Sequence, residues 1–141
     1  MPRQNIASGK KSQVANAHSA GIRASGEFLF TSGITPRDEN GDLVGAGDMA
    51  MQIRQTLSNL EDVLQAGGAG FGDVVKFTVF VTDIESFVAA RQEGDTGLER
   101  AMTAAPALTL VEISRLAHPD MMVEIEATAQ TGETELHKSP S

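Results

Sequence analysis

The chain has no cysteine, tryptophan or tyrosine among its 141 residues. Without cysteine, it has no disulfide framework, no thiolate nucleophile and no zinc site with cysteine ligands. Its three histidines do not stand at the spacings typical of metal ligands. We therefore expect neither a metal site nor catalysis by a cysteine.

Basic residues are also scarce, because 11 Lys and Arg stand against 19 Asp and Glu, a net charge of -8. Affinity for nucleic acid depends largely on basic side chains that neutralise phosphates. With only six Phe as aromatic residues, the chain offers no obvious platform on which bases could stack. Nucleic acid is therefore not an expected partner, and a pocket for a small molecule would have walls of Phe, Leu, Met and backbone groups.

Long apolar runs are absent as well, and none approaches the roughly 20 residues that span a bilayer. The start of the chain, MPRQNIASGKKSQ, is polar and unlike a targeting segment. We expect a cytoplasmic protein with no membrane partner, and its length fits one domain with one core. Residues 1–16 and 132–141 lack periodicity and are predicted to be flexible, which leaves 17–131 as the domain.

The first half of that domain shows two different periodicities. Residues 21–33 contain two short extended runs separated by Ser25 and Gly26, a pattern typical of a hairpin. From Asp48, apolar residues recur every three or four positions until Gly67. This spacing predicts a helix with a capped start and a glycine stop.

The second half predicts strand, helix and two further strands. Residues 73–83 alternate apolar and polar side chains, as in a strand with one buried face. Residues 84–102 suggest a second helix, which Gly94 and Gly97 each weaken by roughly 1 kcal/mol relative to alanine. Residues 105–130 are predicted to form two strands around a turn near residue 118.

This order of elements predicts an α+β domain, in which two helices pack on one face of a mixed sheet. The other face would expose apolar side chains such as Phe28 and Phe30. Self-association is the simplest way to cover such a face.

Carboxylates accompany the last two strands. Alternation in MMVEIEATA places Glu124 and Glu126 on the face opposite Val123 and Ile125. These carboxylates could decorate a solvated face, or one could be partly desolvated in a cleft and handle protons. A hairpin near residue 118 would also bring Glu112 close to Glu124.

Several of these segments resemble the reactive intermediate deaminase family, also called the YjgF family. They are FTSG at 30–33, QIRQTLSNLEDVLQAGG at 52–68, GDVVKFTVFVTDIESF at 72–87, and PALTLVEISRL followed by VEIEATA. The resemblance covers residues 18–130 in order. It implies a chorismate-mutase-like fold, a homotrimer with a cleft at each subunit interface, and hydrolysis of enamines or imines without metal or cofactor.

The resemblance also implies site residues. Glu124 matches the acidic residue that orients the attacking water, and Ser32 and Gly33 match a pair that lines the pocket. The backbone of Leu110 matches a position that helps to hold water and substrate, and Thr109 belongs to the same wall. Such a site is chemically sufficient, because an iminium carbon is already electrophilic and needs mainly a placed water and a proton acceptor.

The chain departs from the family at Leu108, where the active branch has an arginine that grips the substrate carboxylate. Arg91 stands where relatives commonly have asparagine, and it either supplies the missing cation or is a solvated helix arginine. His18 falls near a position often occupied by tyrosine, as a pocket residue or a surface histidine. Gly94 and Gly97 replace bulky aromatics, which either enlarges a pocket or loosens the helix.

Two functions follow from this pattern. The first is a homotrimeric hydrolase that releases ammonia from an enamine or imine of a small metabolite, with room for substrates larger than 2-aminoacrylate. The second is a trimer that binds or senses a small molecule without catalysis, because the arginine anchor is missing.

Overall fold

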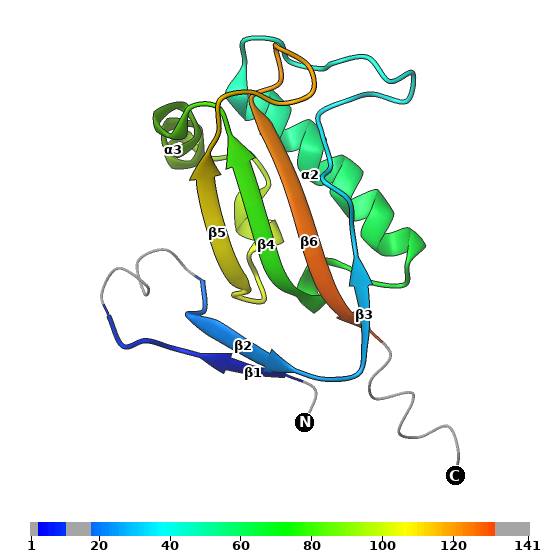
Figure 1. Cartoon of the computed structure of the whole chain (residues 1–141), viewed down its shortest axis with the longest axis vertical. Coiled ribbons are helices and arrows are strands. Elements are labelled where there is room, and N and C mark those ends of the chain that lie inside the picture. Colours follow the sequence, from blue (N-terminus) through cyan, green and yellow to red (C-terminus); the bar gives the residue numbers. More distant parts are fainter. Residues whose placement is uncertain (1–2, 11–17, 132–141) are drawn as a thin grey trace.

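The computed structural model describes residues 3–10 and 18–131 (Figure 1). The strands are β1 (Arg3–Ile6), β2 (Gly21–Ala24), β3 (Glu27–Phe30), β4 (Val74–Val81), β5 (Ala107–Glu112) and β6 (Val123–Thr131). The helices are α2 (Met49–Ala66), the short 3-10 helix η1 (Phe71–Asp73), α3 (Ile84–Glu93) and α4 (Leu98–Ala101).

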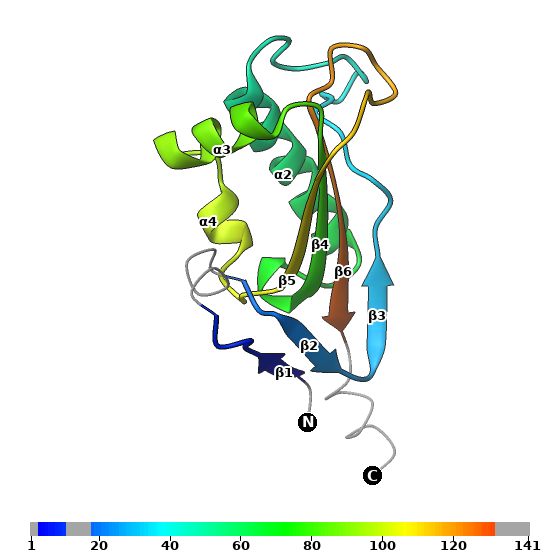
Figure 2. The same cartoon turned by 60° about the vertical axis from the view of Figure 1, so that its left-hand side comes forward.

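The main sheet has four strands in the order β3-β6-β4-β5, and β1 pairs with β2 in a separate ribbon. Strands β4 and β5 are parallel, whereas β6 runs antiparallel to both of its neighbours. In Figure 2, α2, α3 and α4 all lie on the same side of this sheet. The predicted α+β class, with a mixed sheet and helices on one face, is confirmed.

Helix α2 begins and ends where the sequence predicts. The Asp48 side chain accepts a hydrogen bond of 3.1 Å from the Met51 N–H, which satisfies a free donor at the helix start. Gly67 follows the last helical residue. The buried stripe that faces the sheet consists of Met49, Gln52, Ile53, Thr56, Leu57, Leu60 and Leu64.

The sheet contributes the other half of the core. Strand β4 buries Val74, Phe77, Val79 and Val81 against the helices, and β6 buries Val123, Ile125, Ala127 and Ala129. Burying each large apolar side chain contributes about 1.5–3 kcal/mol. Because neighbouring residues of a strand point to opposite faces, this burial fixes Glu124, Glu126 and Phe80 on the face without helices.

The predicted hairpin of the last two strands is wrong. Strand β4 lies between β5 and β6, so Glu112 pairs in register with Val81 and is not adjacent to Glu124. The Glu112 carboxylate instead accepts a hydrogen bond of 3.0 Å from the Ile84 N–H, at the start of α3. An anionic acceptor suits that position because the first N–H groups of a helix lack partners.

The single helix predicted over 84–102 is also wrong, because the structure divides it into α3 and α4. Gly94 and Gly97 have φ angles of +85° and +90°, which residues with a side chain rarely adopt. The two glycines therefore end α3 and redirect the chain into α4.

The structure contradicts two predictions for the N-terminal part of the chain. Strand β1 falls within the segment 1–16 that was predicted to be flexible, and the Arg3 side chain donates to the Ala104 carbonyl at 2.8 Å. The predicted hairpin between the two runs of 21–33 is wrong as well, since β2 pairs with β1 and β3 pairs with β6. The predicted C-terminal tail, 132–141, lies outside the described residues.

Candidate functional site

Glu124 and Gly33 form the centre of the candidate site, on the sheet face without helices. The chain after β3 runs beside β6, where the backbones of Ile34 and Ile125 exchange two hydrogen bonds of 2.8 and 3.0 Å. This pairing brings Gly33 directly against the Glu124 side chain. A Cβ atom at position 33 would lie 2.6 Å from the Glu124 Cδ and closer still to Oε2, so only glycine leaves room for the carboxylate.

The Glu124 carboxyl group is half-buried, and its pKa is raised above the usual value. The main cause is desolvation, which disfavours the charged form, and the second is the negative charge of nearby Glu126. Among residues 3–10 and 18–131, no side chain forms an ion pair or hydrogen bond with this carboxylate. Glu124 is therefore a partly desolvated proton acceptor without a cationic partner among the described residues.

The immediate neighbours of Glu124 combine apolar and polar groups. Phe80 pairs with Glu124 across the β4–β6 ladder and is half-buried, while Ser32, next to Gly33, is exposed. Of the predicted pocket residues, the structure thus brings Ser32, Gly33 and Glu124 to one place on the sheet.

Gln52 positions the start of β6 and was not predicted as a functional residue. Its fully buried side chain accepts a hydrogen bond of 2.7 Å from the Met122 N–H. It also donates to the carbonyls of Asp120, at 2.9 Å, and Gly45, at 3.1 Å. One amide therefore ties α2 to the loop before it and to the turn that leads into Glu124. The sequence feature that could have indicated this role is the presence of a polar residue, Gln52, within the apolar stripe of the helix.

Leu108 and Leu110 lie on the opposite face of the sheet from Glu124. In the parallel ladder they pair with Phe77 and Val79, whose side chains point toward the helices. There they line a cavity of about 260 Å³ between the sheet, α3 and α4. Arg91, in the last turn of α3, lines the same cavity. The structure therefore brings Arg91 close to Leu108, as it must if Arg91 supplies the cation that relatives have at position 108. Neither residue lies next to Glu124 of the same chain.

Thr109 and His18 lie elsewhere. Thr109 points to the face without helices, where its hydroxyl accepts a hydrogen bond of 2.7 Å from the Lys76 ammonium. His18 precedes Ser19, which bridges to Ala107 at the beginning of β5. Ala107 pairs with Lys76 of β4, whereas Glu124 pairs with Phe80, four residues further along the same strand. His18 therefore lies at the other end of the sheet from Glu124.

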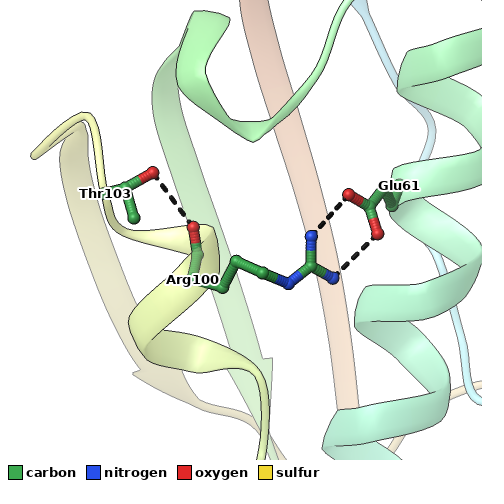
Figure 3. A network of polar contacts seen from close by, with 3 residues as sticks. All are labelled: Glu61, Arg100 and Thr103. Atoms are coloured by element: carbon green, nitrogen blue, oxygen red, sulfur yellow. Dashed lines mark hydrogen bonds and ion pairs between the residues drawn. The ribbon is translucent and has the colours of Figure 1, made fainter.

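Helix α4, one wall of the cavity, is fixed to α2 by a charged pair (Figure 3). The Arg100 guanidinium donates two hydrogen bonds, of 2.6 and 2.8 Å, to the Glu61 carboxylate, and it lies 5.0 Å from the ring centroid of Phe71. This pairing lowers the pKa of Glu61. A two-pronged contact of this kind restricts geometry more than a single bond does, so it defines where the cavity wall stands.

The residues that the structure describes contain no cluster of metal ligands and no helix that could span a membrane. No group of three or more Asp, Glu or His side chains within 3–10 and 18–131 could hold a metal ion. No helix in the same ranges is long and apolar enough to cross a membrane.

Comparison with known proteins connects this geometry to a family. The family model described as Endoribonuclease L-PSP matches residues 9–131. A 2-iminobutanoate/2-iminopropanoate deaminase of Salmonella typhimurium is 36% identical over 104 residues, which is 74% of this chain and 80% of that protein. A RutC family protein of Pyrococcus horikoshii is 37% identical over 112 residues, 79% of this chain and 85% of that protein.

Solved structures show the same fold. The Rid family protein YyfB from Yersinia pestis, a protein of unknown function, has a TM-score of 0.78 at 30% identity, and covers 93% of this chain and 100% of its own. E. coli TdcF with bound serine has a TM-score of 0.65 at 30% identity, covering 81% of this chain and 87% of its own.

Proposed function

Because the chain belongs to the reactive intermediate deaminase (YjgF) family, which the family match and the deaminase relatives show, we propose that it hydrolyses an enamine or imine of a small metabolite. Water adds to the carbon–nitrogen double bond, and the products are ammonia and a carbonyl compound. The proposal includes a homotrimer with the chorismate-mutase-like arrangement and a site in each cleft between subunits. The cytoplasm is its expected compartment.

The observation that carries this proposal is the half-buried Glu124 carboxylate held against Gly33. Its raised pKa makes it a better proton acceptor than an exposed glutamate. The neighbouring glycine gives the carboxylate the space that a side chain at position 33 would otherwise take. A water that donates a hydrogen bond to Glu124 would be oriented toward a substrate bound over this face.

The reaction needs only a few proton transfers. Glu124 takes a proton from water as the water oxygen forms a bond to the iminium carbon, and the electron pair of the carbon–nitrogen double bond moves to nitrogen. The protonated Glu124 then returns the proton to that nitrogen. Ammonia leaves as the carbon–nitrogen bond breaks and the remaining hydroxyl becomes a carbonyl, and the hydroxyl proton passes to the Glu124 carboxylate and from there to solvent. An enamine enters the same sequence after it gains a proton on carbon and becomes an iminium ion.

A second copy of the chain completes the proposed site. Glu124 and the wall formed by Leu108, Leu110 and Arg91 lie on opposite faces of one sheet, so they cannot meet around one substrate within a single chain. The face that carries Glu124 also exposes Phe30 at 72% and Phe28 at 37%. Such an apolar face is a typical subunit interface, and its burial would desolvate Glu124 further.

The alternative is a trimer that binds a small molecule without hydrolysing it. Leu108 supports this alternative, because a leucine cannot form the two-pronged charged contact with a carboxylate that an arginine provides. The ribonuclease activity in the description of the family model is not favoured, since a net charge of -8 opposes binding of RNA.

The test is release of ammonia from freshly generated imines and enamines, both short and long, by the wild-type protein and by Glu124→Gln. The account predicts hydrolysis that is lost in Glu124→Gln. The matched control is Glu27→Gln, which changes an exposed glutamate on β3 and should keep full activity. No hydrolysis of any compound by an intact oligomer would favour the binding role.

A further inference from the structure

The cavity between the sheet, α3 and α4, which supplies one wall of the proposed site, indicates which ligands that site could hold. Its volume is about 260 Å³, and apart from two charged residues its lining is apolar. The apolar lining includes Leu57, Phe87, Leu98, Met102, Leu108 and Leu110. Pockets with apolar walls and a few polar groups are typical binding sites for small molecules.

The two charged residues of the lining are Arg91 and Glu99. Arg91 is exposed, and its guanidinium forms no hydrogen bond or ion pair with any residue of the described ranges. By contrast, Arg100 is paired with Glu61, and Arg54 donates to the Asp95 carbonyl at 2.9 Å. Arg91 is thus a cation available to a ligand at an apolar cavity.

The break between α3 and α4 follows shortly after this cation in the chain. Gly94 follows α3 directly, and a Cβ atom at that position would meet no other atom within 4 Å. At Gly97, an added Cβ would reach Leu57, a residue of the cavity wall, at 3.4 Å. On the other side of this break, the Arg100–Glu61 pair joins α4 to α2.

We propose that this cavity binds the hydrocarbon chain of an aliphatic carboxylate, and that Arg91 holds the carboxylate group. Leu108 then takes part in binding as an apolar wall, and Arg91 replaces the anchor that an arginine at position 108 would provide. Because a water occupies about 30 Å³, the cavity has room for roughly eight non-hydrogen atoms. Resting on the proposed function, this inference names the substrate class: 2-imino acids with an aliphatic side chain of about four carbons.

Glu99 further restricts the class of ligand that the cavity should bind. A second negative charge on the ligand would come close to this carboxylate, which lines the same cavity. Monocarboxylates should therefore bind better than dicarboxylates of the same length.

Binding can be measured without any reaction, by calorimetric titration of the intact protein with acetate, butanoate and hexanoate. Each buried methylene group should raise the affinity about fourfold, since its transfer from water contributes about 0.8 kcal/mol. Adipate, with two carboxylates, and hexanamide, with none, should each bind at least tenfold more weakly than hexanoate. Affinity that does not change with chain length would overturn the proposal.

Variants identify the two parts of the site. Arg91→Gln should weaken hexanoate binding about tenfold or more, while Arg91→Lys should recover part of the loss. Arg23→Gln, which removes an exposed arginine of β2, is the matched control and should bind hexanoate as the wild type does. Leu108→Trp should fill the cavity and reduce the preference for long chains. Wild-type hexanoate affinity in Arg91→Gln would refute the role of Arg91.

The outcome separates this inference from the proposed function. If hexanoate binds with the expected dependence on chain length and no imine is hydrolysed, the proposed function fails but the binding site stands. If imines are hydrolysed with the same kcat/KM at every chain length and in Arg91→Gln, the function stands and this inference fails.

Discussion

Gly33 lies directly against the carboxylate of Glu124, and no other residue at position 33 would leave that carboxylate where it is. Two segments about ninety positions apart in the sequence meet here because the chain after β3 pairs with β6. The contact holds a half-buried proton acceptor on the sheet face without helices. It is the feature on which the proposed chemistry depends.

Replacing Gly33 with alanine tests this contact. The new methyl group must displace Glu124, since its carbon would otherwise lie 2.6 Å from the Glu124 Cδ. We expect Gly33→Ala to lose most of its ammonia-releasing activity, with a change of no more than about 0.5 kcal/mol in the free energy of unfolding, because the flexible Glu124 side chain can turn away from the new methyl group. At Gly21 an added Cβ would meet nothing within 4 Å, so Gly21→Ala is the control and should remain active. Full activity of Gly33→Ala would mean that the position of Glu124 is unimportant.

The pH dependence of hydrolysis should reveal how the negative charge of Glu126 affects the pKa of Glu124. Glu124 acts as a base only when it is ionised, so activity falls as the pH decreases through its pKa. That pKa is raised by burial and by the negative charge of Glu126. Removing this charge in Glu126→Gln should lower the pKa of Glu124 and move the acidic limb of the pH–rate profile to lower pH. A shift to higher pH, or none, would show that Glu126 does not act on Glu124.

Replacing Gln52 should lower the free energy of unfolding. In Gln52→Leu, the Met122 N–H and the Asp120 and Gly45 carbonyls lose a buried partner. Leaving such groups unsatisfied costs about 1–3 kcal/mol, and denaturant unfolding should show a loss of at least this size. Gln65→Leu, an exposed change on the same helix, should alter stability by no more than about 0.5 kcal/mol. Equal stability of the two variants would contradict this role.

Local patterns in the sequence predicted those features that local interactions decide. The caps and the apolar stripe of α2 follow from Asp48, Gly67 and the spacing between them. The face on which Glu124 lies follows from alternation in β6, because the side-chain period of a strand is fixed.

Features that depend on pairing between distant segments were not predictable in the same way. Alternation gives the face of a strand but not its neighbour, so the insertion of β4 between β5 and β6 left no local signal at Glu112. For the same reason, alternation alone could not show that the side chains of Leu108 and Glu124 point to opposite faces of the sheet within one chain, an arrangement that is compatible with the expected cleft between subunits. The break at Gly94 and Gly97 was visible as weak helix propensity, but its φ angles depend on the packing of α4.

The central claim is that one catalytic site is built from two copies of this chain, with Glu124 from one and the wall containing Leu108 from the other. The most direct measurement is ammonia release from a long-chain aliphatic 2-imino acid by oligomers reassembled from equal amounts of Glu124→Gln and the cavity-filling variant Leu108→Trp, each of which should be inactive alone toward this long substrate. Random mixing should restore about a quarter of the sites, because a site is complete when each copy contributes its intact half. If mixed trimers form and remain inactive, both groups act within one chain, and the shared site is contradicted.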